Sequence, residues 1–248
     1  MDAIIETLAR ELSRDPVQVE NVVRLIDEGN TIPFIARYRK ELHGAMDDTT
    51  LRTLADRLQY LRNLAKRREE VRASIEGQGK LTEELAAALD AAATLAEVED
   101  LYRPYKPKRR TRATMAKEKG LEPLADALSA FGGPVDPAAL AAAYVDPEKG
   151  VETVEDALQG ASDIVAERIS DDAGLRKVLR ALYLRRGTLV SRAAEKEPED
   201  TVYRLYYDFQ APVSRVQGHQ VLAIDRGERE GVLKVSVDLD PEAAKVAV

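Results

Sequence analysis

Two prolines near the middle of the chain set the first constraint on its fold. Pro104 and Pro107 stand within the stretch EDLYRPYKPKRRTR. Each lacks a backbone N–H, and each drives the residue before it out of the α-helical region of φ/ψ space. A helix therefore cannot run through this stretch. We expect an extended, basic segment here between two helical regions, and we call residues 99–125, which contain it, the strap. Helices are expected on either side of that segment, over residues 94–102, 115–119 and 121–131.

The rest of the sequence favours helices. Alanine and leucine are abundant, charged residues make up 33% of the chain, aromatic residues make up only 5%, and tryptophan is absent. Apolar residues recur at helical spacing over most of the chain, which is typical of amphipathic helices packed on a core. The predicted fold class is mainly all-α. It is an elongated multi-helix array with a helix-turn-helix-like N-terminus, one long helix and a short β segment near the C-terminus.

Three short helices and one long helix are predicted in the first part of the chain. The short helices are expected over residues 2–12, 16–28 and 34–42, and their tight connections resemble a helix-turn-helix. The long helix is expected from Asp47 to Gly77, with a leucine stripe on one side. The cations of its later half are expected to form a solvated face, balanced by Glu69, Glu70 and Glu76.

The last part of the chain is predicted to mix helix and strand. A short helix is expected from Leu189 to Glu195 and a longer one over residues 219–230. Strict apolar–polar alternation over residues 233–240 then predicts a half-buried strand. Its partner is expected either beyond Val248 or in residues 220–225. We divide the chain into residues 1–75, the helical start and long helix, residues 76–210, a scaffold that carries the strap, and residues 211–248.

The sequence offers no convincing catalytic or metal-binding set. Cysteine is absent, and the two histidines, His43 and His219, stand in no metal-ligand pattern. Neither a glycine-rich phosphate loop nor a nucleophile elbow is found. The paired acids at 47–48 and 171–172 stand where helix N-caps are expected. We therefore predict a protein that is not an enzyme, with no catalytic residues, no metal and no cofactor.

Positive charge, tyrosine and proline are concentrated in the strap. Guanidinium groups match phosphate oxygens, and a tyrosine ring can stack on an unpaired base. The candidate nucleic-acid-binding residues here are Arg103, Tyr105, Lys106, Lys108, Arg109, Arg110 and Arg112. Two other interpretations stay open. The strap can be purely intramolecular, with Tyr102 and Tyr105 packed and the cations paired with acids such as Glu97, Glu99 and Asp100, or it can dock an acidic protein.

A second group of cations lies in the third predicted helix. Arg37, Arg39 and Lys40 are weaker candidates for nucleic-acid contact, because Phe34, Ile35 and Tyr38 are expected to form one packed face of that helix. The chain as a whole is acidic, with a net charge of −7. Any nucleic-acid contact should therefore be local, salt-sensitive and weak by itself.

Three stretches resemble one protein family. They are LIDEGNTIPFIARYRKELHG from Leu25, DLYRPYKPKRRTRATMAKEKGLEPLA from Asp100, and GHQVLAIDRGEREGVL from Gly218. They look like signature stretches of the bacterial transcription accessory protein Tex family. The resemblance covers the whole chain, and the two longer stretches are very specific. His43 and Ala45 depart from the family pattern.

The resemblance implies a part of a longer cytoplasmic protein that binds nucleic acid in transcription without an established enzymatic step. Family members have an N-terminal all-helical region, followed by an RNase H-like domain, a helix-hairpin-helix module and an RNA-binding OB-fold domain. This chain would be the helical portion, and residues 211–248 would lead towards the missing RNase H-like domain. Since the OB-fold carries the main nucleic-acid binding, this portion is expected to bind weakly.

Two hypotheses about function follow. The first is a non-catalytic helical scaffold that assists RNA or DNA binding in transcription. The second is a protein-interaction module that docks on RNA polymerase or other transcription proteins through its helix-turn-helix-like start. The acidic N-terminal stretch MDAIIETLARELS is not a signal peptide, and no apolar run is long enough to span a bilayer. No membrane association is predicted, and the expected location is the cytoplasm.

Overall fold

The computed structural model describes residues 2–107, 110–130, 136–195 and 201–246. Helices dominate these residues, and a small antiparallel sheet lies near the C-terminus, which confirms the prediction of a mainly helical protein with a β segment in this region. The chain divides into two compact units, Met1–Tyr102 and Arg103–Val248. The division at residues 75 and 210 stays a prediction.

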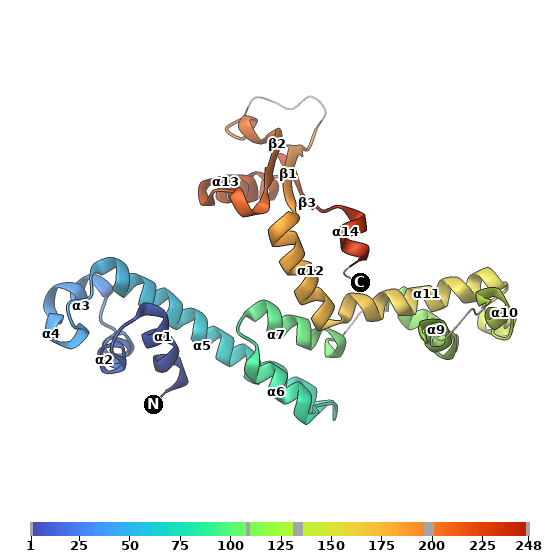
Figure 1. The fold of residues 1–248 in the computed structure, drawn as a ribbon, viewed down its shortest axis with the longest axis horizontal. Coiled ribbons are helices and arrows are strands. Elements are labelled where there is room, and N and C mark those ends of the chain that lie inside the picture. The colour runs from blue at the N-terminus through green and yellow to red at the C-terminus, as the bar shows by residue number, and fades with distance from the viewer. Residues whose placement is uncertain (1, 108–109, 131–135, 196–200, 247–248) are drawn as a thin grey trace. The chain divides into compact units, whose positions relative to one another are not determined.

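The first unit is built on one long helix, α5 (Asp48–Gly77). The helices α1, α2 and α3 contact its first half, and α6 and α7 contact its second half (Figure 1). The other helices of this unit are α1 (Ala3–Leu12), α2 (Pro16–Asp27), α3 (Ile32–Tyr38), α4 (Lys40–His43), α6 (Glu83–Ala91) and α7 (Leu95–Tyr102).

Side-chain caps and a leucine-rich core explain these helices. Asp15 caps α2 by accepting a hydrogen bond from the N–H of Val17, and Asp47 caps α5 by accepting one from Thr50. The core residues Leu8, Ile35 and Leu54 are all fully buried. The predicted caps and the leucine stripe of the long helix are therefore confirmed.

The third predicted helix is interrupted. Residues 34–42 were expected as one helix, but α3 ends at Tyr38 and α4 begins at Lys40. Arg39 between them has φ −130° and ψ 32°, outside the helical region. An interrupted helix leaves carbonyls without partners, and the Arg39 guanidinium donates a hydrogen bond of 3.0 Å to the carbonyl of Tyr38. The Arg39 side chain thus stabilises the interruption between α3 and α4.

The cations of α5 do more than form a solvated face. Arg67 pairs with Glu70, as expected. Other arginines of α5 reach neighbouring helices: Arg57 binds both oxygens of Glu11 on α1 at 2.7 and 2.8 Å, and Arg62 binds both oxygens of Asp27 on α2 at the same distances. These bidentate pairs fix α1 and α2 against α5.

The second unit contains a helical group gathered on α11 (Val154–Asp171). The helices α8, α9 and α10 contact α11 (Figure 1). A side chain at Gly160 would collide with Leu121, so glycine permits this close packing. The other helices of the unit are α8 (Arg112–Glu118), α9 (Glu122–Ser129), α10 (Pro137–Ala142), α12 (Ala173–Arg186), α13 (Gly218–Arg229) and α14 (Pro241–Lys245).

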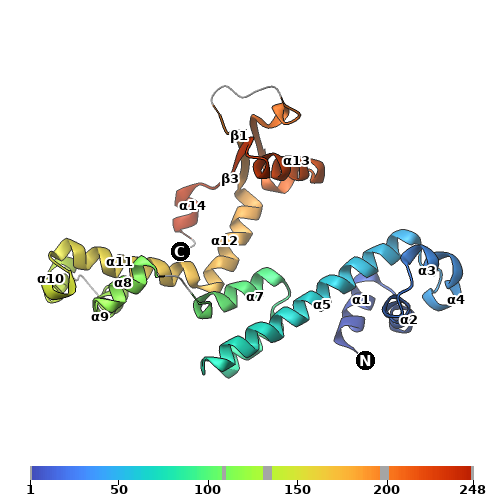
Figure 2. The same cartoon turned by 180° about the vertical axis from the view of Figure 1, so that it is seen from behind.

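A three-stranded antiparallel sheet with the order β2-β1-β3 completes this unit (Figure 1). Figure 2 shows β1 and β3 of this sheet from behind, with α13 beside them. Its strands are β1 (Thr188–Ala193), β2 (Asp208–Pro212) and β3 (Leu233–Asp238). The predicted strand and the preceding helix, α13, are confirmed, but the predicted pairing is wrong. The partner of β3 is β1, with Ala193 opposite Leu233. Most of β1 had been expected to form the short helix from Leu189 to Glu195. The short segment is a strand because it lies between two others, which complete its backbone hydrogen bonds.

Candidate nucleic-acid interface

The strap is less extended than its prolines suggest. Helix α7 runs to Tyr102, a 3-10 turn covers Arg103–Tyr105, and α8 begins at Arg112. Pro104 fits the short turn, which has no long helical hydrogen-bond ladder to break. Thr111 caps α8 by accepting a hydrogen bond of 3.0 Å from the N–H of Thr114. The helices expected over residues 94–102, 115–119 and 121–131 are present as α7, α8 and α9. The segment between α7 and α8 is less extended than expected, because it begins with the 3-10 turn.

The two tyrosines of the strap differ in burial. Tyr102 is buried, its hydroxyl shares a hydrogen bond of 2.9 Å with Ser74, and the Arg67 guanidinium lies 5.5 Å from the centre of its ring. Tyr105, the predicted stacking residue, is half-buried. The packing interpretation is therefore confirmed for Tyr102.

Three predicted cations of the strap are exposed and paired with acids. Arg103 lies 2.9 Å from Asp171 of α11, and its side chain is 46% exposed. Arg110 lies 2.7 Å from Glu118 of α8 and is 69% exposed.

Arg112, the third of these cations, lies 3.8 Å from Asp163 of α11 and is 79% exposed. Lys106 is exposed, and Lys108 and Arg109 lie outside the described residues. Arg110 and Arg112 therefore lie at the start of α8, and both side chains are mostly exposed to solvent. Their partners come from α8 and α11, which the intramolecular interpretation did not name.

The predicted packed face of the third helix is only partly correct. Ile35 is fully buried and Phe34 is half-buried, but Tyr38 is 60% exposed. Tyr38 is the last residue of α3, directly before the interruption at Arg39. Its ring therefore leaves the core face that Ile35 occupies.

The cations beside Tyr38 have a different setting from those of the strap. The Arg39 guanidinium lies 5.1 Å from the centre of the Phe34 ring. Arg37 and Lys40 are exposed and make no ion pair with any described residue. The segment therefore carries two exposed cations without an ion pair to a described residue, next in sequence to Tyr38 and Arg39.

A third basic element was missed in the sequence. Helix α12, 14 residues long, contains no acidic residue and carries Arg176, Lys177, Arg180, Arg185 and Arg186. It also exposes apolar side chains, with Val178 at 50% and Leu184 at 58% exposure. The signal was present in the sequence, because five cations stand within the eleven residues from Arg176 to Arg186 without an acid among them.

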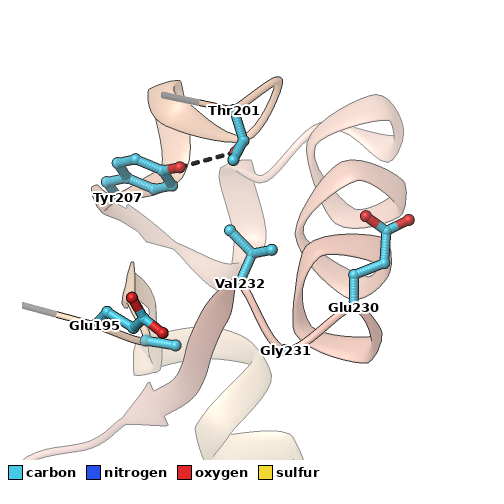
Figure 3. A pocket seen from close by; sticks show the side chains of 7 residues that line it. Glu195, Thr201, Tyr207, Glu230, Gly231 and Val232 are labelled. Atoms are coloured by element: carbon cyan, nitrogen blue, oxygen red, sulfur yellow. Dashed lines mark hydrogen bonds between the residues drawn. The ribbon is translucent and has the colours of Figure 1, made fainter. Parts of the chain in front are cut away.

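A pocket beside the sheet contains acids but no predicted site residue (Figure 3). Glu195, Thr201, Tyr207 and Glu230 line it, and the hydroxyls of Thr201 and Tyr207 share a hydrogen bond of 2.8 Å. Hydrogen bonds from Arg226 and Tyr203 hold the pKa of Glu230 below its ordinary value. Glu230 thus ties α13 to the turn before β2, and we assign it a structural role.

Among the described helices, even α5, at 30 residues, lacks the continuous apolar stretch that a bilayer crossing requires.

Comparison with known families finds two matches. Residues 2–76 match the Tex-like protein N-terminal domain, and residues 134–247 match the Tex central region-like domain. The two matches together account for most of the chain, and residues 77–133, with the whole of the strap, lie between them.

Individual relatives agree with these matches. The chain is 48% identical to the protein tex of Bordetella pertussis over 96% of its length, and 44% identical to the transcriptional accessory protein Tex of Neisseria gonorrhoeae, also over 96%. It covers 30% and 31% of those two proteins, so it spans about a third of their length. The S1 RNA-binding domain-containing protein 1 of Homo sapiens is 32% identical over 95% of the chain, which covers 24% of that protein.

Proposed function

The chain belongs to the Tex family of transcription accessory proteins, and we propose that it is a non-catalytic helical scaffold whose exposed cations contact the phosphates of nucleic acid. One observation carries this proposal. Arg103, Arg110 and Arg112 lie within one short segment, and their side chains are 46%, 69% and 79% exposed. Exposed guanidinium groups so close together can contact successive phosphates of one strand.

The acidic partners of these arginines do not prevent such contacts. Exposed ion pairs contribute about 0–1 kcal/mol to stability, because water and salt screen them. A phosphate that displaces Glu118 from Arg110 therefore has little to overcome, because both side chains of that pair are more than half exposed. Asp163 is only 16% exposed, but the Arg112 side chain is 79% exposed and can contact a phosphate while this pair stays in place. The net charge of −7 opposes binding at long range, so the contact is expected to be weak and local.

The names of the relatives support the proposal of nucleic-acid contact. The printed name of the human relative includes an S1 RNA-binding domain, and that of the Neisseria relative describes a transcriptional accessory protein. The present chain spans only part of these proteins, so nucleic-acid contact by its own residues is our proposal. An assisting role in a longer, cytoplasmic protein is consistent with weak binding.

The test is a titration of the 248-residue chain with single-stranded RNA and with duplex DNA at two salt concentrations. We expect affinity to fall steeply with salt for both ligands. The double variant Arg110→Ala/Arg112→Ala should bind both ligands more weakly. Its salt slope should decrease by about one for each lost phosphate contact.

A matched control is available on α13. Arg226 and Arg229 are each 75% exposed, and each pairs with an acid four residues away. Arg226→Ala/Arg229→Ala therefore makes the same change in charge and in ion pairing at another surface. An equal loss in both double variants would contradict a specific contact at the strap. No binding at low salt would sink the proposal and favour a module that docks on transcription proteins through α1–α4.

A further inference from the structure

At the interruption between α3 and α4, the exposed Tyr38 lies in one small group with the half-buried Phe34 and Arg39, called the Tyr38 platform below. The ring centres of Phe34 and Tyr38 are 5.2 Å apart, and the ring planes are tilted by 46°. The Arg39 guanidinium lies 5.1 Å from the centre of the Phe34 ring. Phe34 is half-buried, whereas Tyr38 is 60% exposed. An aromatic ring is thus held at the surface with one side supported.

Two sets of contacts hold the Tyr38 platform in place, the burial of the neighbouring Ile35 and the contacts of the Arg39 side chain. Ile35, the residue after Phe34, is fully buried in the core of the first unit. Arg39 is fixed twice, by its contact with the Phe34 ring and by its hydrogen bond of 3.0 Å to the Tyr38 carbonyl. Side chains that are already ordered lose little conformational entropy when a ligand binds. Phe34 and Arg39 are therefore preorganised, and the Tyr38 ring is supported by its contact with Phe34.

Positive charge stands on both sides of the exposed ring in the sequence. Arg37 precedes Tyr38, Lys40 follows Arg39, and neither cation makes an ion pair with a described residue. The one acid in this stretch, Glu41, is also exposed and makes no ion pair there. The surface therefore combines an exposed ring with two cations that make no ion pair with a described residue, in a stretch from Arg37 to Glu41 whose net charge is positive.

We propose that the Tyr38 platform stacks on an unpaired base of single-stranded nucleic acid, while Arg37 and Lys40 contact the adjoining phosphates. This inference rests on the proposed function, nucleic-acid contact, and adds a preference for single strands and a stacking residue. A flexible strand offers a flat π-face and a phosphate at each nucleotide, which matches a ring flanked by cations.

Duplex and protein ligands match this surface less well. In a duplex the faces of the bases are stacked on one another, so Tyr38 has no base face to contact. The carboxylates of an acidic peptide would pair with Arg37 and Lys40, but they offer no flat ring that could stack on Tyr38. A single strand is the ligand that satisfies the ring and both cations together.

The test uses the 248-residue chain and a short single-stranded RNA that carries a fluorescent adenine analogue. Binding should quench the analogue, because stacking on an aromatic ring changes its emission. Tyr38→Ala should abolish the quenching and weaken binding roughly 5- to 150-fold, the loss that corresponds to one stacked base. Tyr38→Phe keeps the ring and should bind within about two-fold of the original chain.

Two controls make the result specific. Tyr183→Ala removes another exposed tyrosine, which is also on a basic helix, and should leave the quenching intact. Binding of a duplex of the same sequence should not change in Tyr38→Ala. Circular dichroism and thermal unfolding of each variant should confirm that the fold is retained.

Each alternative result separates this inference from the proposed function. If Tyr38→Ala binds single strands as well as the original chain, but Arg110→Ala/Arg112→Ala binds more weakly, stacking is overturned and phosphate contact stands. An equal loss on single strands and duplex, or an equal loss in Tyr183→Ala, also overturns the inference. If the original chain binds neither ligand at low salt, both proposals fall.

Discussion

The two basic regions that the sequence singled out, the strap and the segment around Tyr38, look alike in sequence and differ in structure. The strap carries the denser charge, yet Arg103, Arg110 and Arg112 each lie within 4 Å of an acid. The segment around Tyr38 carries less charge, but Arg37 and Lys40 make no ion pair with the described residues. The density of positive charge along a chain is therefore a poor guide to the charge that a ligand meets.

The difference arises from what each region packs against. Helix α8, which begins at Arg112, lies on α11, and α11 presents Asp163 and Asp171 to the strap. The segment around Tyr38 instead ends a short helix at an interruption, where its last side chain turns away from the core. Packing thus supplies partners to one set of cations and leaves the other set without an ion pair to a described residue.

The largest expected effect comes from removing the support below the Tyr38 platform. Ile35→Ala deletes a fully buried side chain from the core that holds α3. Such truncations cost about 2–5 kcal/mol. Urea unfolding should show this loss, and the quenching assay should show a disturbed platform, while phosphate binding at the strap persists in the folded fraction.

The control for that experiment is Val17→Ala on α2, where the side chain is 58% exposed. Surface changes of this kind usually alter stability by less than about 0.5 kcal/mol. If Ile35→Ala proves as mild as Val17→Ala, the platform does not depend on the core as we describe.

A moderate effect is expected from releasing a cation of the strap. Glu118→Gln removes the carboxylate that lies 2.7 Å from Arg110. If pairing limits the strap, this variant should bind single-stranded RNA more tightly, by up to about five-fold, the range of an exposed ion pair. Fluorescence titration at low salt measures the change.

Glu228→Gln is the matched control, because Glu228 is exposed on α13 and its substitution makes the same change in net charge. Equal gains in the two variants would show that overall charge matters, and that the pairing of Arg110 does not.

The smallest expected effect concerns pH and the unit that carries the Tyr38 platform. The hydrogen bond from Arg57 lowers the pKa of Glu11 below its ordinary value of 4.5, and the hydrogen bond from Arg62 lowers the pKa of Asp27 below 3.8. A carboxylate whose pKa is lower in the folded protein stabilises the fold above its unfolded pKa. That stabilisation is lost as the pH falls through the folded pKa. The first unit should therefore loosen below about pH 4.5.

Because these pairs are about a third or more exposed, each should contribute only about 0.2–1 kcal/mol. Thermal unfolding between pH 7 and pH 3 measures the effect. In Glu11→Gln part of this pH dependence should disappear. If the pH profile of the variant matches that of the original chain, the pair between Glu11 and Arg57 does not hold α1 on α5.

Local sequence determined much of the fold, because caps and helical periodicity act over a few residues. Asp15 and Asp47 mark the starts of α2 and α5, and the leucines of α5 repeat at the spacing that buries one side of a helix. The stretches from Leu25 and Asp100 identified the family without any structure. For the candidate site, the sequence located both groups of cations.

Tertiary structure alone decided the rest, because the deciding partners lie far apart in the chain. The segment Thr188–Ala193 is a strand since β2 and β3 complete its hydrogen bonds, and nothing within the segment specifies them. The acids that pair with the strap come from α8 and α11, and the exposure of Tyr38 follows from the interruption at Arg39. Sequence thus placed the charges, and long-range packing determined which of them remain open to a ligand.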